Sequence, residues 1–216
     1  MRLGMAIDLD KCVGCKGCQV ACKEWNTSGP LGPLPDLDPY GAHPEGVWFK
    51  RVYSLEAGEF PATSVLYFPK ACMHCDSPPC VEVCPTGASH RGDHGLVLVD
   101  TKLCVGCQLC TWACPYGTRE FDPVEKVVKK CTFCVDRIDN ESLPPEERLP
   151  ACVLNCPTRA GVFGDLDDAE SELTKAIVTR GGMPLLPEQG TGPAVYYLPR
   201  RNISVHGADG SKGVRR

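Results

Sequence analysis

The 216-residue sequence predicts an α+β fold built from repeated cysteine-rich units. Three observations predict this fold. Sixteen cysteines fall into four runs, and each run contains a C-x2-C pair. Short apolar segments typical of strands precede the first three runs. The second and third runs also repeat the order strand, cysteine loop, short helix, which is the mark of an internal duplication.

The third run, Cys104 to Pro115, has the spacing C-x2-C-x2-C-x3-C-P. Bacterial ferredoxins use this spacing to hold [4Fe–4S] clusters. Three cysteines on a tight loop can bind three irons of one cluster, whereas the fourth lies a helical turn further on and reaches a second cluster. Each run therefore needs a partner run. Because the chain has four runs, we expect four [4Fe–4S] clusters.

The first run spans Cys12 to Cys22 and follows a strand predicted at residues 5–10. Gly14 and Gly17 let its backbone fold closely around a cluster. Lys23 stands where the third run has a proline, but proline is not a ligand, so no ligand is lost.

Residues 26–46 carry five prolines and four glycines, a density that excludes helices and strands. A loop of this length is either functional or a solvated insertion, and we expect it to dock onto a partner. Residues 47–53 and 64–68 then predict two strands around a turn at Ala57-Gly58. Their aromatic side chains are expected in the core or against a partner.

The second run, Cys72 to Cys84, has a middle gap that is two residues longer but still presents three cysteines on one loop. His74 lies between its first two cysteines. Because all four cysteines are present, we expect His74 to lie behind the ligands or at the surface rather than to bind iron. Residues 95–100 predict the strand that leads into the third run.

The fourth run is split, because 17 residues separate Cys134 from Cys152. Within this gap, residues 139–150 hold a pair of prolines and several acidic residues, and they predict an exposed loop. Taken alone, Cys131, Cys134, Cys152 and Cys156 are also compatible with a zinc site, and a cysteine-rich chain is compatible with disulfides. The neighbouring runs favour clusters, because C-x2-C-x2-C packs three thiolates more tightly than a zinc ribbon needs.

After the fourth run, residues 167–180 predict a helix with acidic residues in its first turn and Gly181-Gly182 after its last turn. Residues 183–201 are expected to be mostly extended. The polar tail, residues 206–216, is expected to be disordered.

The net charge is −4 with neutral thiols. Each oxidised [4Fe–4S] core with four thiolates adds −2, so four clusters bring the net charge to about −12. Such a protein does not look like a nucleic-acid binder, and it needs backbone N–H groups and cations near its clusters. Six lysines next to or inside the runs either supply that charge or are ordinary surface residues: Lys11, Lys16, Lys70, Lys102, Lys129 and Lys130.

Residues 1–8 lack the apolar core of a signal peptide and a twin-arginine start, so we expect a reducing, cytoplasmic compartment. No window approaches the roughly 20 apolar residues of a membrane span. We therefore expect a peripheral protein without a transmembrane segment, which reaches a membrane through a partner. An exported partner would instead carry it to the periplasm.

The sequence contains no nucleophile motif, phosphate loop or dinucleotide fingerprint. His43, His90, His94 and His206 are scattered in loops, and none is expected to be a catalyst. Four fully ligated clusters leave no open iron for a substrate. We therefore expect single-electron transfer and no catalytic site on this chain. Four clusters in one small protein indicate a wire between a donor and an acceptor.

Four motifs carry a family resemblance: Cys-Pro-Thr-Gly-Ala-Ser at 84–89, Cys-Pro-Tyr-Gly at 114–117, Lys-Cys-Thr-Phe-Cys at 130–134 and Phe-Gly-Asp-Leu at 163–166. With the four runs in this order, residues 5–200 resemble the four-cluster electron-transfer subunits of molybdopterin oxidoreductases. That family includes the iron–sulfur subunits of dimethyl sulfoxide, polysulfide and tetrathionate reductases. Within it, the chain most resembles the iron–sulfur subunit of membrane-bound, cytoplasmic sulfite dehydrogenase. The stretches behind this choice are residues 22–29, 38–41, 46–49, 181–182 and 197–201.

The resemblance implies a three-subunit complex at the cytoplasmic face of the membrane. A catalytic subunit would carry a molybdenum bis-pterin cofactor, and a polytopic membrane subunit would bind quinone. Electrons from the oxidation of sulfite to sulfate would pass through this chain to quinone. The alternatives are the same wire in a dimethyl sulfoxide, polysulfide or tetrathionate reductase, and a stand-alone polyferredoxin.

The resemblance also pairs the first run with the fourth and the second with the third, with one cysteine exchanged within each pair. It implies two ferredoxin-like modules related by a pseudo-twofold axis, one from residues 1–25 and 126–166 and one from residues 66–125. Residues 26–65 would form an insertion with the docking loop and a hairpin, and residues 167–216 a C-terminal extension. The implied ligand sets are Cys12, Cys15, Cys18 and Cys156 for the first cluster, Cys131, Cys134, Cys152 and Cys22 for the second, Cys72, Cys75, Cys80 and Cys114 for the third, and Cys104, Cys107, Cys110 and Cys84 for the fourth.

Overall fold

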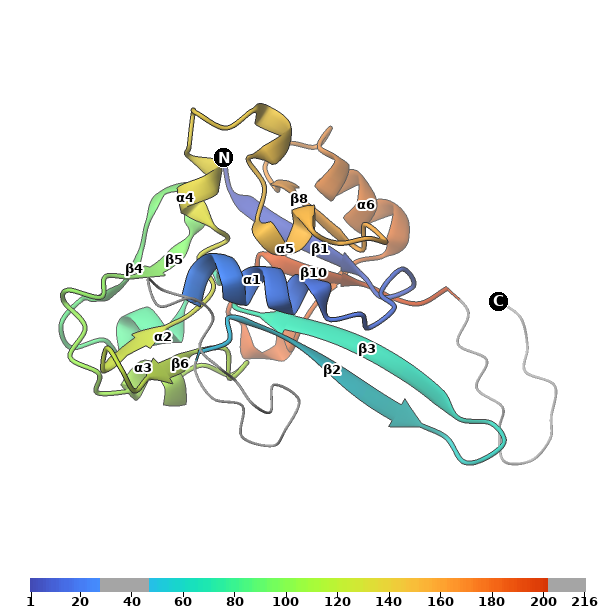
Figure 1. Cartoon of the computed structure of the whole chain (residues 1–216), viewed down its shortest axis with the longest axis horizontal. Helices are drawn as coiled ribbons and strands as arrows, with labels where there is room; N and C mark the ends of the chain where they lie inside the picture. The colour runs from blue at the N-terminus through green and yellow to red at the C-terminus, as the bar shows by residue number, and fades with distance from the viewer. Residues whose placement is uncertain (28–46, 202–216) are drawn as a thin grey trace.

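The computed structural model describes residues 1–27 and 47–201, and it confirms the predicted mixture of helix and sheet (Figure 1). The strands are β1 (Leu3–Asp8), β2 (Lys50–Ala57), β3 (Ser64–Ala71), β4 (Ser89–Arg91), β5 (Val97–Val99), β6 (Glu120–Asp122), β7 (Val127–Lys129), β8 (Gly161–Asp165), β9 (Met183–Pro184) and β10 (Val195–Leu198). The α-helices are α1 (Gly17–Thr27), α2 (Pro79–Glu82), α3 (Leu109–Trp112), α4 (Val135–Ile138), α5 (Ala151–Leu154) and α6 (Glu172–Arg180).

One four-stranded sheet, in the order β8-β1-β10-β9, joins the N-terminal strand to the C-terminal part of the described chain (Figure 1). Strand β1 runs antiparallel to β8 and parallel to β10. All six residues of β1 are buried, because the sheet is covered on both faces. Ala6 packs with Leu173 of α6, whereas Met5 and Ile7 point into the core that contains the cysteines. This alternation follows from the two-residue period of a strand.

Helix α6 begins five residues later than the sequence predicts, at Glu172 rather than at residue 167. The carboxylate of Asp168 accepts the backbone N–H of Glu170 at 2.9 Å, which forms a local turn in place of the first helical turn. Ser171 then caps the helix by accepting the N–H of Thr174 at 3.1 Å. The predicted end is confirmed, because Gly181 takes the left-handed conformation directly after the last residue.

Strands β2 and β3 form the predicted hairpin, in register from Lys50 opposite Ala71 to Ala57 opposite Ser64. The first strand begins three residues later than predicted, at Lys50. Residues 47–49 are buried but are not part of the strand. The hairpin projects from the body of the molecule (Figure 1), and its outer half is exposed. Phe60, in the turn, is 91% exposed.

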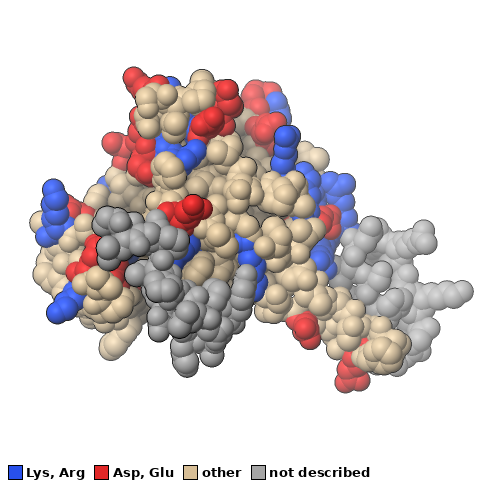
Figure 2. Space-filling view, viewed as in Figure 1, with Lys and Arg blue, Asp and Glu red and all other residues tan. Residues whose placement is uncertain are grey.

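The remaining sheets are the two small hairpins β4–β5 and β6–β7. The insert between α4 and α5 is mostly exposed, as predicted, and its acidic side chains gather at the top of the face in Figure 2. The proposed docking loop, the polar tail, His43 and His206 lie wholly or mainly outside the described residues. No helix within residues 1–27 and 47–201 has the length and apolar character needed to cross a membrane.

Candidate cluster sites

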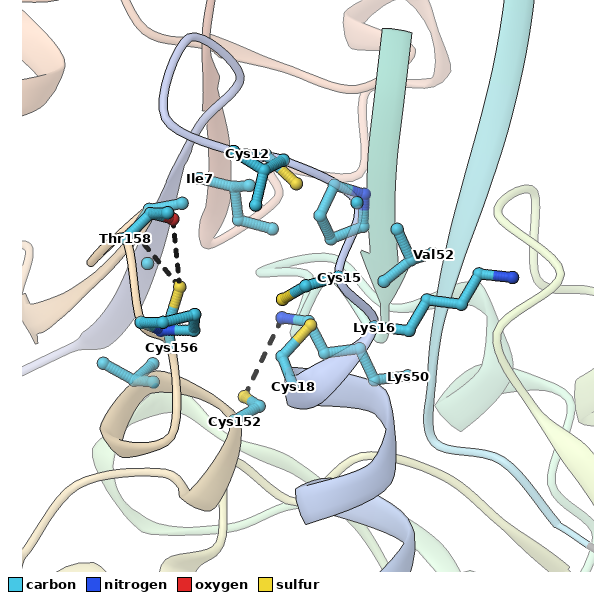
Figure 3. Close-up of a pocket in the computed structure, with 17 residues that line it drawn as sticks. Ile7, Cys12, Cys15, Lys16, Cys18, Lys50, Val52, Cys152, Cys156 and Thr158 are labelled. Atoms are coloured by element: carbon cyan, nitrogen blue, oxygen red, sulfur yellow. Dashed lines mark hydrogen bonds between the residues drawn. The ribbon is translucent and has the colours of Figure 1, made fainter.

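The first predicted ligand set surrounds one cavity (Figure 3). Cys12 and Cys15 come from the loop after β1, Cys18 lies in the first turn of α1, and Cys156 comes from the segment before β8. The pairing of β1 with β8 brings these segments together although they are far apart in the sequence. The carbonyl of Asp8, at the end of β1, accepts the N–H of Cys12 at 3.1 Å, so the strand holds the start of the loop.

The second set gathers where α1 packs against α5. Asn26, one helical turn after Cys22, places its amide nitrogen 3.7 Å from the Cys22 sulfur and 3.5 Å from the Cys134 sulfur. Burial raises the pKa of Cys22 well above its ordinary value, and the neighbouring thiolates of Cys131, Cys152 and Cys134 raise it further. The four thiols are therefore close enough to interact electrostatically. Cys152 also lines the first cavity.

The third and fourth sets each line a cavity of their own. The third cavity is lined by Cys72, Cys75, Cys80 and Cys114. The fourth is lined by Cys84, Cys104, Cys107 and Cys110. In each cavity one cysteine comes from the partner run, which is the exchange expected from ferredoxin spacing.

The same backbone turn recurs in all four runs. The residue directly before the second cysteine of each run has a positive φ. These residues are Gly14 (67°), His74 (44°), Gly106 (67°) and Phe133 (55°). In two runs the turn directs an N–H to the first sulfur, at 3.5 Å from His74 to Cys72 and at 3.4 Å from Phe133 to Cys131. The His74 and Phe133 rings stack at 3.9 Å, so packing holds the two strained positions that lack glycine.

Two cysteines that are followed by Pro-Thr share a second pattern. The Cys84 sulfur accepts the N–H of Ser89 at 3.3 Å, and the Cys156 sulfur accepts the N–H of Ala160 at 3.3 Å. A threonine hydroxyl two residues after each cysteine lies 3.7 Å from its sulfur. Burial raises the pKa of both thiols, but these donors outweigh it and the net pKa of each is lowered. The donors therefore favour the thiolate, which is the form that binds iron.

Deeper cysteines behave in the opposite way. Burial raises the pKa of Cys18 and Cys75 to about 11 and that of Cys131 to about 12. Such thiols lose their protons only when a metal centre takes up the charge. Within residues 1–27 and 47–201, no three His, Cys, Asp or Glu side chains surround a point that one metal ion could occupy. The sulfurs are instead set around cavities and supplied with N–H donors, and this donor set fits [4Fe–4S] clusters.

The burial of three cations, Lys23, Lys50 and Arg119, was not predicted from the sequence. Lys50 and Arg119 are 5% and 6% exposed. Lys23 is buried too, and it donates to the carbonyl of Val47 at 3.1 Å. Burial of Lys50 could have been inferred only from the alternation of side chains along β2, in which Lys50 and Val52 occupy inward positions. Among the six lysines that the sequence places beside the runs, Lys130 is buried and the others are half-buried or exposed.

His74 is fully buried, in agreement with the predicted position behind the ligands rather than with the alternative at the surface. Its Nδ1 accepts the N–H of Val97 at 3.2 Å, so it supports the core behind the second run. His90 contacts the carbonyl of Ala88 at 3.0 Å, and His94 pairs with Asp139 at 3.7 Å. These local contacts do not form a catalytic arrangement.

Comparisons with known proteins place this chain among iron–sulfur proteins. Two family models described as 4Fe-4S dicluster domains match residues 11–88 and 63–166. The chain is 55% identical to a subunit of sulfite dehydrogenase from Allochromatium vinosum, over 95% of this chain and 86% of the relative. It is 35% identical to the arsenate respiratory reductase iron–sulfur subunit of a Shewanella species, over 92% of this chain and 96% of the relative. It is 38% identical to a subunit of tetrathionate reductase from Salmonella typhimurium, over 91% of this chain and 72% of the relative.

Proposed function

Because the chain belongs to the family of iron–sulfur subunits of molybdopterin oxidoreductases, we propose that it relays electrons from a molybdenum bis-pterin catalytic subunit to a quinone-binding membrane subunit during oxidation of sulfite to sulfate. It is a non-catalytic electron-transfer subunit with two dicluster domains and four [4Fe–4S] clusters. When bound, each cluster accepts and donates single electrons. The observation that supports the sulfite assignment is the 55% identity to a sulfite dehydrogenase subunit, against 35–38% for the two reductase subunits.

We further propose the four ligand sets predicted from the sequence. The three cavities and the thiol group around Cys22 support them, because each gathers one complete set. The proposed first module combines residues 1–25 with 126–166, and the pairing of β1 with β8 supports it. Strands β9 and β10 extend the same sheet. The pseudo-twofold relation to the second module, residues 66–125, is part of this proposal, and the repeated positive-φ turn in all four runs supports it.

The membrane subunit and the cytoplasmic face of the membrane also belong to the proposal. A tag on this chain allows the native complex to be isolated from membranes in mild detergent. Sulfite-dependent quinone reduction is then measured beside quinol-dependent reduction of dimethyl sulfoxide, polysulfide and tetrathionate. We expect sulfite activity, with molybdenum present in the complex. Protease protection in right-side-out and inverted vesicles gives the membrane side, and cleavage only in inverted vesicles is the expected result.

Activity only in the reductive assays would keep the electron-transfer role and overturn the sulfite assignment. A chain that is isolated alone, loaded with iron but without molybdenum, would favour a stand-alone polyferredoxin.

A further inference from the structure

Three buried cations lie between successive cysteine sets. Lys50, Lys130 and Arg119 are 5%, 2% and 6% exposed. The ion pairs found among the described residues include none of the three. A buried cation without a carboxylate partner is costly unless another negative group neutralises it. The groups around these cations identify that partner.

Lys50 stands between the first and second sets. Its side chain reaches into the first cavity beside Cys15 and Cys18 (Figure 3). Its Nζ lies 3.8 Å from the sulfur of Cys152, which belongs to the second set. Burial lowers the pKa of Lys50, but the thiolates of Cys152, Cys18 and Cys131 more than compensate, and the net pKa is raised.

Lys130 stands between the second and third sets. Its Nζ donates to the carbonyl of Cys131, a member of the second set, at 2.7 Å. It also donates to the carbonyl of Val97, and the same residue lines the third cavity. The ammonium group is therefore fixed by backbone carbonyls on both sides. Burial lowers the pKa of Lys130, and the thiolates of Cys72 and Cys131 offset part of that lowering.

Arg119 stands between the third and fourth sets, because it lines both cavities. One terminal nitrogen donates to the Ser89 hydroxyl at 2.7 Å. Its Nε and Nη1 are buried and have no hydrogen-bond partner among the described residues. Two buried, charged N–H groups without an acceptor destabilise the fold. The cavities of the third and fourth sets flank these groups.

We propose that Lys50, Lys130 and Arg119 are positioning residues that set the reduction potentials of the clusters on either side of them. Each places one fixed positive charge in a low-dielectric junction between two clusters. A fixed cation favours the state with the extra electron, so it raises the potentials of both neighbours. The alternation of four sets with three cations also offsets the repulsion between electrons on adjacent clusters. This inference depends on the proposed ligand sets and is independent of the substrate.

The test is a redox titration of the purified complex, followed by EPR of the reduced clusters. The neutral variants are Lys50→Met, Lys130→Met and Arg119→Gln, and the charge-retaining variants are Lys50→Arg and Arg119→Lys. Lys102→Met is the matched control, because Lys102 lies beside the third run but is exposed. We expect each neutral variant to shift two of the four midpoint potentials to more negative values. The expected size is a tenfold change in the redox equilibrium or more, which is about 59 mV for one electron.

Charge-retaining variants and the Lys102 control should leave the four potentials near those of the wild type. Shifts in the neutral variants no larger than that of the control, or an equal shift of all four clusters, would overturn the proposal. If a neutral variant of Lys50 or Arg119 loses a cluster, the iron content per chain of its charge-retaining variant is measured. Wild-type iron content in the charge-retaining variant supports the role of the positive charge, and an iron loss equal to that of the neutral variant contradicts it. A wild-type complex with fewer than four EPR-active clusters would instead refute the ligand sets, and a missing sulfite activity would affect only the substrate assignment.

Discussion

Arg180, the last residue of α6, ties the C-terminal helix to the start of the first cysteine loop. Its guanidinium lies 2.6 Å from the carboxylate of Asp8 and 2.9 Å from that of Asp10. It also donates to the carbonyl of Pro199 at 3.1 Å. The Asp8 side chain is only 4% exposed, and the Asp8 carbonyl accepts the N–H of Cys12. Loss of Arg180 should therefore destabilise the fold and loosen the first loop.

We predict that Arg180→Met lowers the free energy of unfolding by about 3–5 kcal/mol, because it leaves the buried Asp8 carboxylate without its cation. Lys175→Met is the matched control on the same helix. Lys175 pairs with Glu170 at 2.8 Å, but their side chains are 57% and 85% exposed. Such an exposed pair contributes about 0–1 kcal/mol.

Because cluster loss makes unfolding irreversible, the assay is the rate at which the iron–sulfur absorbance bleaches in denaturant. Each 1.4 kcal/mol is a factor of about ten. If the ion pair is absent from the transition state, Arg180→Met bleaches at least about 100-fold faster and Lys175→Met less than about 6-fold faster. Equal rates for the two variants would refute the reasoning. Adding Asp8→Asn to Arg180→Met should recover part of the loss, and no recovery would assign the effect to packing rather than charge.

Three further predictions concern the cysteine loops and α6. Gly14→Ala should lower iron content, because a Cβ at φ +67° would overlap the Tyr67 ring, whereas Gly87→Ala, at φ +69° with open space around it, should cost only about 1–2 kcal/mol of backbone strain and keep its iron. Cys107→Ser should remove one of the four EPR-active clusters and cut electron flow, and full turnover without that cluster would contradict a single wire. Ser171→Ala should lower stability by about 1 kcal/mol through loss of the helix cap, measured by the same bleaching assay.

The parts of the fold that could be predicted are mostly those that depend on local sequence patterns. The two strand segments around the turn at Ala57-Gly58 and the glycine after α6 are local patterns, and the structure contains both the hairpin and the helix end that they predict. The start of α6 was predicted wrongly, because the Asp168 side chain competes for backbone N–H groups that a helix would use. Strand β10 could be predicted only as extended chain. Its parallel partner, β1, lies about 190 residues earlier, and nothing in a four-residue apolar segment specifies so distant a partner.

In the candidate site, too, local features could be predicted and features that depend on long-range contacts could not. Cysteine spacing predicted the loops, because each loop is a local structure. The positive φ at His74 and Phe133 could not be predicted, because neither position is a glycine. The two rings stack on each other and stabilise these positions through a contact between two runs. Lys50 lies 22 residues from the nearest cysteine in the sequence, so cysteine spacing contains no information about it. Its role depends on where β2 enters the core.

Burial also explains why the exposed lysines beside the runs cannot replace the buried cations. Two unit charges 4 Å apart interact by about 1 kcal/mol in bulk water and by about 4 kcal/mol at an effective dielectric constant of 20. Lys11 and Lys102 are adjacent to cysteine runs in the sequence, but they are exposed to water. Lys50 lies 3.8 Å from a cysteine sulfur and is almost fully buried. One such cation therefore offsets as much cluster charge as several surface lysines, and a chain whose loaded charge is about −12 gains most from cations placed where two clusters share them.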